Sequence, residues 1–129
     1  MDLKLKNKIV LIAGSSKGIG FASAQAFVNE GAKVAITGRD SESLEKACRM
    51  LGKGNDVLKI QGDMANPKTI DSALKKTASH FGKINIVIAN VGSGTGKKGF
   101  DLKFEDWQSI LNTNLIGSMT LASKSIPYL

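Results

Sequence analysis

A glycine-rich turn directly after an apolar run is the first stretch of this sequence whose residue types and spacing point to chemistry. Gly14, Gly18 and Gly20 are spaced by four and two residues and follow the apolar residues 9–12. Where a strand turns into a helix, the free N–H groups and the positive end of the helix dipole attract an anion. We expect Gly14 to permit the tight turn, Gly18 to let the backbone approach a pyrophosphate, and Gly20 to let the helix pack closely on the strand. The pattern favours a bound dinucleotide.

Two basic residues indicate which dinucleotide this turn would bind. At the end of the second strand of such a unit, a ribose 2′-hydroxyl usually meets an acidic residue, whereas a 2′-phosphate needs positive charge. Arg39 stands at this point, and Lys17 in the glycine turn can approach the same group. Asp40 follows, but we expect it to start the next helix. The residues predict NADP(H), and the alternative is an ordinary turn with two unrelated surface cations.

The elements that must position these residues are short apolar runs separated by segments with helical periodicity. The runs are rich in Val and Ile without polar alternation, which favours strands covered on both faces, and they span residues 9–13, 33–37, 57–61 and 84–89. Apolar residues recur at helical spacing in residues 19–30, 41–51 and 67–81. The order predicts an α/β fold, a Rossmann-type doubly wound parallel sheet with its strands in the order 3-2-1-4.

The ends of several helices are also marked. Asn66 followed by Pro67 is a capping side chain with proline at the first helical position, and Gly31 and Gly82 stand where a left-handed residue would end a helix. A last helix is expected from about residue 104 to residue 126, where Pro127 would stop it. Before it, the glycine-rich residues 91–99 are expected to form a mobile, solvated turn at the substrate edge.

The composition of the chain indicates its cellular compartment and excludes some classes of partner. The chain has 129 residues, 42% of them hydrophobic, which fits one dinucleotide-binding domain over residues 1–129. With Cys48 as its one cysteine, no disulfide framework is available, so a reducing compartment is expected. No apolar run approaches the roughly 18 residues of a membrane span, and the first residues lack the apolar core of a signal peptide. We expect a cytoplasmic protein with no membrane partner and no metal site.

The formal net charge of +7 is spread along the chain, which indicates a solvated basic surface. Specific nucleic-acid binding is not expected, because the sequence has neither a basic stripe nor aromatic residues interleaved with basic ones.

Four short motifs, in this order, resemble those of the short-chain dehydrogenase/reductase family. They are AGSSKGIG at residues 13–20, Gly62-Asp63 after the third strand, ANVG at residues 89–92 after the fourth strand, and NLIG at residues 114–117 in the last helix. The match runs through essentially the whole chain. Ala13 and the ANVG motif depart mildly from the usual threonine and from Asn-Asn-Ala-Gly, which concerns the hydrogen bonds that brace the fourth strand.

The resemblance implies roles for individual residues. Asp63 and Met64 would flank the adenine, Asn90 and Gly92 would line the ribose side, and Asn114 would be the asparagine of the catalytic set. Lys17 with Arg39 resembles the family's NADP-preferring pattern. We therefore assign cofactor binding to Gly14, Ser16, Lys17, Gly18, Ile19, Gly20, Arg39, Asp63, Met64, Asn90 and Gly92.

The same resemblance implies an oxidoreductase that transfers a hydride between nicotinamide and a carbonyl or secondary alcohol, a 3-oxoacyl reductase-like activity among the options. Family enzymes also carry a serine and a Tyr-x-x-x-Lys, and only Asn114 of that set precedes Leu129. We therefore expect the N-terminal half of such an enzyme, truncated before its catalytic segment, which binds cofactor without catalysis and forms a homo-oligomer through the last helix. The alternative is a non-catalytic nucleotide-binding or regulatory module.

Overall fold

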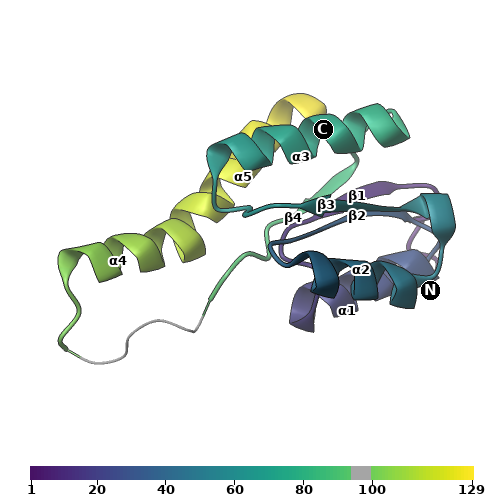
Figure 1. The fold of residues 1–129 in the computed structure, drawn as a ribbon. Coiled ribbons are helices and arrows are strands. Elements are labelled where there is room, and N and C mark those ends of the chain that lie inside the picture. Colours follow the sequence, from purple (N-terminus) through teal and green to yellow (C-terminus); the bar gives the residue numbers. More distant parts are fainter. Residues whose placement is uncertain (94–99) are drawn as a thin grey trace.

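Four parallel strands lie between two layers of helices (Figure 1). The computed structural model describes residues 1–93 and 100–129. The strands are paired in the order β3-β2-β1-β4, which confirms the predicted order. Their bounds are β1 (Ile9–Ile12), β2 (Lys33–Gly38), β3 (Val57–Gln61) and β4 (Ile86–Ile88).

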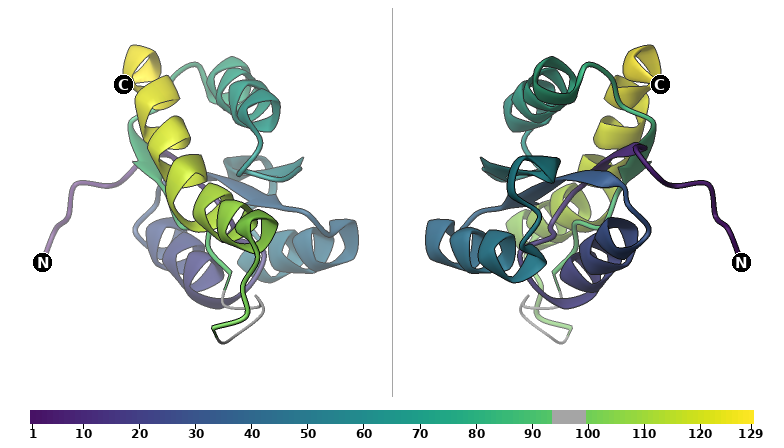
Figure 2. Two further views of the ribbon diagram at one scale, coloured as in Figure 1. Left: turned by 90° about the vertical axis from the view of Figure 1, so that its left-hand side faces the viewer. Right: turned by 90° about the vertical axis from the view of Figure 1, so that its right-hand side faces the viewer.

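The helices cover both faces of the sheet. α1 and α2 lie side by side on one face, and α3 and α5 lie side by side on the other, as the two views of Figure 2 also show. Their bounds are α1 (Gly18–Asn29), α2 (Ser41–Leu51), α3 (Pro67–Phe81), α4 (Phe104–Leu111) and α5 (Gly117–Ser125). The chain therefore has the predicted α/β, doubly wound architecture.

Alternate residues of the central strands build two separate cores. Val10 and Ile12 of β1 pack with α1 and α2 in one cluster, whereas Leu11 belongs to the cluster beneath α3 and α5. This follows from the pleat of a strand, which sends successive side chains to opposite faces. The expectation that all strands are covered on both faces holds for β1 and β2 alone. In β3 only Val57 and Ile60 are buried, and β4 is half-buried, because both strands lie at the edges of the sheet.

The predicted helix ends are confirmed. The Asn66 side chain accepts a hydrogen bond from the Lys68 backbone N–H over 2.9 Å at the start of α3, with Pro67 in the first turn. Gly82 ends that helix with φ +90°, and Gly31 follows α1 with φ +79°. Cys48 lies half-buried in α2 against the first core cluster.

The last helix differs from its prediction. The chain is helical beyond residue 104 but contains a π-helical turn at Asn112–Ile116, between α4 and α5. The α-helix ends at Ser125, next to the expected stop, and Pro127 lies in a 3₁₀ turn at Ile126–Tyr128. π-helical turns insert one extra residue into a helix and recur at functional sites. Here the turn contains Asn114.

Within the residues that the structure describes, no helix is long and apolar enough to cross a membrane. In the same part of the chain, no group of three or more His, Cys, Asp or Glu side chains is arranged to hold a metal ion. Residues 94–99 lie outside the described part, so the mobile turn expected there stays a prediction.

Candidate functional site

The glycine turn between β1 and α1 is built around close backbone contacts. Gly14 has φ +63°, in the left-handed region that favours glycine. A β-carbon on Gly20 would lie 2.2 Å from the Gly14 carbonyl oxygen and 2.6 Å from Nδ2 of Asn90. Gly20 therefore lets the start of α1 approach the residues that follow β1 and β4 closely.

A buried pair of hydroxyl residues holds this turn to the end of β2. The Thr37 hydroxyl oxygen accepts from the Gly14 backbone N–H over 2.9 Å, and the Ser15 hydroxyl donates to the Ile12 carbonyl over 2.7 Å. Both side chains are fully buried. Neither was predicted from the sequence as part of the site, although two hydroxyl residues at the ends of adjacent buried strands are a signal for such a network.

A hollow of about 200 Å³ lies at the carboxyl end of the sheet. Ligands of open α/β sheets bind outside this edge, where the direction of winding reverses between neighbouring strands. In the order β3-β2-β1-β4 that point lies between β1 and β4. The hollow is lined by Gly14, Ser16, Lys17, Thr37, Gly38, Arg39, Asp40, Gly62, Asp63, Met64, Asn90, Val91, Gly92, Ser93 and Thr113.

The structure brings together most of the residues assigned from the sequence. Eight line the hollow, namely Gly14, Ser16, Lys17, Arg39, Asp63, Met64, Asn90 and Gly92. Four assigned residues are not in its lining. Gly18 lines a neighbouring groove between α1 and α2, Gly20 is buried beneath the turn, and Ile19 is 79% exposed. Asn114 contacts the lining through Ser93.

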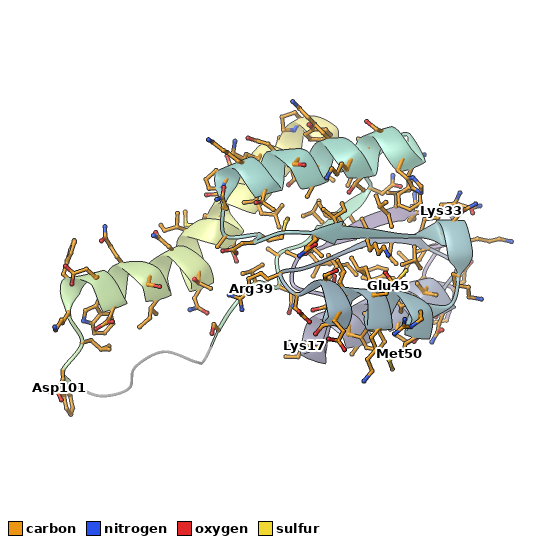
Figure 3. All side chains as sticks on the ribbon, in the orientation of Figure 1. Lys17, Lys33, Arg39, Glu45, Met50 and Asp101 are labelled. Atoms are coloured by element: carbon orange, nitrogen blue, oxygen red, sulfur yellow. The ribbon has the colours of Figure 1, made fainter. Side chains whose placement is uncertain are left out.

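Lys17 and Arg39 enter the hollow from two different loops. Figure 3 shows both at one end of the sheet, with Lys33 at the opposite end. Neither cation forms an ion pair with the residues that the structure describes. The Arg39 backbone is fixed by Gln61, whose Nε2 donates to the Arg39 carbonyl over 3.2 Å. Both side chains are therefore available to an anion.

Ser16 can lie at this edge of the sheet because Gly38 has no side chain. A β-carbon on Gly38 would lie 2.9 Å from the Ser16 hydroxyl oxygen, closer than real β-carbons approach. The sequence alone does not indicate this role of Gly38, because the contact joins two loops that are distant along the chain.

Asp40 is the N-cap of α2, as the sequence predicted. Its carboxylate accepts hydrogen bonds from the Ser43 backbone N–H, over 2.8 Å, and from the Ser43 hydroxyl. These bonds hold the pKa of the Asp40 carboxyl below its ordinary value, and the nearby Lys17 ammonium lowers that pKa further. The hollow therefore contains a fixed carboxylate beside its two cations.

The residues present fit a dinucleotide. The glycine turn presents backbone at a helix start without intervening side chains, and two unpaired cations stand at the end of β2.

The model of the short-chain dehydrogenase family matches residues 8–129. The chain belongs to the short-chain dehydrogenase family. It is 37% identical over 118 residues to the NADP-dependent (R)-specific alcohol dehydrogenase of Lentilactobacillus kefiri, a match that covers 91% of this chain and 46% of that protein.

Solved structures of short-chain dehydrogenases have the same fold. L-sorbose reductase from Gluconobacter frateurii, complexed with NADPH and L-sorbose, matches with a TM-score of 0.90 and 32% identity over 98% of this chain and 49% of that one. The 3-ketoacyl-(acyl-carrier-protein) reductase from Brucella melitensis, complexed with NADH, matches with a TM-score of 0.88 and 30% identity over 96% of this chain and 51% of that one. The chain thus spans about half the length of these relatives.

Asn90, expected on the ribose side of a short-chain dehydrogenase site, lines the hollow with its side chain turned inward. Its Nδ2 donates to the Gly14 carbonyl over 3.0 Å. The side chain therefore braces the glycine turn against the segment after β4.

Asn114 ties the π-helical turn to the rim of the hollow. Its Oδ1 accepts from the Ser93 backbone N–H over 2.9 Å, and its Nδ2 donates to the carbonyls of Ser93 and Ile110, over 3.3 Å and 3.0 Å. Both ends of the amide are engaged, so its orientation is defined.

Asp63 and Met64, which the family resemblance places beside the adenine, differ in exposure. Asp63 is exposed and accepts from the Ala65 backbone N–H over 2.9 Å, whereas Met64 is 3% exposed and belongs to the core beneath α3. Met64 therefore serves mainly as a core residue that reaches the hollow.

Tyr128 and Lys124 have structural partners. Lys124 donates to both carboxylate oxygens of Asp71 in α3, over 2.9 Å and 3.1 Å, and Tyr128 packs against the second core cluster.

Proposed function

We propose that this chain is the cofactor-binding half of an NADP-dependent oxidoreductase, a short-chain dehydrogenase that acts on a carbonyl or a secondary alcohol. The observation that carries the proposal is that Lys17 and Arg39 line one hollow and form no ion pair within the described residues.

The size of the preference follows from these two cations. A hydrogen bond to a charged group contributes about 1.5–3 kcal/mol. Both side chains are exposed, so screening by water and salt reduces this contribution. We expect a preference for NADPH over NADH of at least about tenfold at low salt, using about 1.4 kcal/mol for each factor of ten.

Two of the matched proteins support this choice. The Lentilactobacillus kefiri relative is an NADP-dependent alcohol dehydrogenase, and the L-sorbose reductase structure contains NADPH. The Brucella melitensis reductase structure contains NADH, so the family alone does not select the cofactor. The proposal therefore depends on this chain's own cations.

The chemistry of the whole protein is part of the proposal. When bound, the nicotinamide cofactor supplies or accepts a hydride. Asn114 is the member of the implied catalytic set within these residues, and its bonds to Ser93 position it at the rim. We expect these 129 residues to bind cofactor without turnover. Carbonyl reduction by the whole protein would favour the enzyme, whereas cofactor binding by that protein without turnover would favour a regulatory module.

The test is a titration of the protein with NADPH and with NADH, followed by fluorescence or calorimetry. Arg39→Glu should weaken NADPH binding and remove the difference between the two cofactors. Arg49→Glu is the matched control, because Arg49 is an exposed arginine in the last turn of α2 and does not line the hollow.

Equal affinities of the unaltered protein for the two cofactors would refute the roles given to Lys17 and Arg39. An equal loss in Arg39→Glu and Arg49→Glu would assign the effect to overall charge rather than to a contact in the hollow.

We also propose a homo-oligomer, with the last helical segment as the contact between copies. Trp107, Leu111, Leu115 and Met119 recur at intervals of four along α4, the π-helical turn and α5, and they are 48–60% exposed. Burial of such a row stabilises association. Sedimentation should show a multimer that Trp107→Glu dissociates, and an unaltered protein that is monomeric at all concentrations would refute the proposal.

A further inference from the structure

A carboxylate lies where the hollow gathers positive charge. Asp40 follows Arg39 directly and lines the hollow together with Arg39 and Lys17. Two cations facing a phosphate are readily explained by the proposed function, but an anion beside them opposes that function. The proposed function therefore does not explain why the Asp40 carboxylate lies beside these cations.

The position of this carboxylate is fixed by the helix that it caps. Both hydrogen bonds from Ser43, from the backbone N–H at 2.8 Å and from the hydroxyl, go to Oδ2 of Asp40. Rotation of the side chain away from the hollow would leave the first turn of α2 without its cap, which is unfavourable. Asp40 therefore stays beside the cations.

The charge of Asp40 is equally constant. The bonds from Ser43, and then the Lys17 ammonium, lower the pKa of the Asp40 carboxyl from its ordinary value of 3.8. At neutral pH the group is therefore ionised in the free protein.

The consequence differs between the two forms of the cofactor. A phosphate monoester carries a charge of about −1.5 to −2 near pH 7. Lys17 and Arg39 attract it and Asp40 repels it, whereas a ribose hydroxyl carries no charge for Asp40 to repel. The carboxylate thus acts on one of the two dinucleotides.

We propose that Asp40 is a specificity-determining residue that weakens the preference of this hollow for a ribose 2′-phosphate while it caps α2. The inference rests on the proposed function, because it presupposes that the 2′-phosphate binds beside Lys17 and Arg39. Its functional meaning is a moderated affinity, which permits the phosphorylated cofactor to leave as well as to bind.

The test is Asp40→Asn, titrated with NADPH and NADH at low and high salt. Asparagine caps helices about as well as aspartate, so the helix start is retained. We expect NADPH to bind roughly two- to fivefold more tightly at low salt, in line with the small energies of exposed charge pairs. The gain should shrink at about 1 M salt, where screening is nearly complete, and the affinity for NADH should stay unchanged.

The matched control is Glu42→Gln. Glu42 is an exposed carboxylate in the first turn of the same helix that does not line the hollow. It should leave both affinities unchanged. An equal gain in both variants would overturn the inference, because the effect would then be one of general charge.

Two other results would overturn it. Weaker NADH binding in Asp40→Asn would make Asp40 an acceptor for the ribose hydroxyl. Unchanged NADPH binding would show that the charge of Asp40 does not affect binding of the 2′-phosphate. Asp40→Ser repeats the test with another capping residue should the asparagine variant fold poorly. An unaltered protein without NADPH preference would refute the proposed function itself, whereas a preference that Asp40→Asn does not increase would refute this inference alone.

Discussion

The Thr37 backbone N–H donates to the Ser15 hydroxyl oxygen over 2.9 Å, and the Ser15 backbone N–H donates to the Thr37 carbonyl oxygen over 2.8 Å. This reciprocal pair joins the end of β2 to the glycine turn after β1. Because both side chains are buried with their polar groups bonded, the pair fixes the position of the turn. The backbone of the glycine turn is thus held by its neighbouring strand as well as by its glycines.

Thr37→Val should lower both stability and cofactor affinity. Valine keeps the shape but removes the acceptor of the Gly14 N–H, which leaves a donor without its partner at a cost of about 1–3 kcal/mol. The free energy of unfolding in urea and the Kd for NADPH measure the two effects. Thr37→Ser is the control, since it keeps the hydroxyl and removes one methyl group. If the valine variant binds NADPH as tightly as the serine variant, the network does not position the turn.

Gly20→Ala should destabilise the protein, against the trend of helix propensity. Propensity alone predicts a gain of about 1 kcal/mol for alanine inside a helix. The added β-carbon would instead lie 2.2 Å from the Gly14 carbonyl oxygen, so the turn must move. Thermal unfolding measures whether the variant is less or more stable, and titration with NADPH measures whether binding changes. A variant with a higher Tm and unchanged binding would contradict the close contact described here.

Leu121→Ala should cost far more than Lys124→Met, although both residues join α5 to α3. Leu121 is 1% exposed and lies in the second core cluster, where a leucine-to-alanine change costs about 2–5 kcal/mol. The bond of Lys124 to Asp71 is partly exposed, so its loss should cost about 1 kcal/mol or less. Urea unfolding of the two variants ranks them. Equal losses would mean that the ion pair, rather than packing, holds α5.

Asp40→Asn should make the free energy of unfolding depend less on pH in the acid range. The Ser43 hydrogen bonds lower the pKa of the Asp40 carboxyl in the folded protein, so its contribution is present above the unfolded pKa of about 3.9 and is lost as the pH falls through the lower folded value. Urea unfolding across the acid range measures this.

Glu42→Gln serves as the comparison, because it removes a carboxylate from the same turn but keeps the Asp40 bonds. If the stability of Asp40→Asn falls with acid pH as steeply as that of the unaltered protein, the Asp40 carboxyl does not cause this part of the pH dependence.

Local signals in the sequence determined much of the architecture. Apolar runs and helical spacing indicated the strands and helices, and the alternating order led to the sheet order that the structure confirms. Asn66 and Gly82 marked the two ends of α3 because capping depends on a few neighbouring residues. The glycine spacing and the two cations likewise pointed to the carboxyl edge of the sheet, where the structure has a hollow.

Contacts between distant segments were decided by the tertiary structure. The π-helical turn contains Asn114, whose amide bonds to Ser93 across 21 residues of chain, a constraint that helical periodicity does not record. Asn90 reaches Gly14 across 76 residues, and its Nδ2 is one of the two groups that leave no room for a side chain at Gly20.

The sequence by itself therefore determined the element order, the helix caps and the presence of a glycine-rich turn with two cations nearby, because each depends on residue type and short spacing. The tertiary structure decided which side chains are free to meet a ligand and which are engaged within the protein. Asp40 is an example of both. Its position at the start of a helix was predicted from the sequence. That its carboxylate shares a hollow with Lys17 depends on how two loops are brought together by the pairing of β1 with β2.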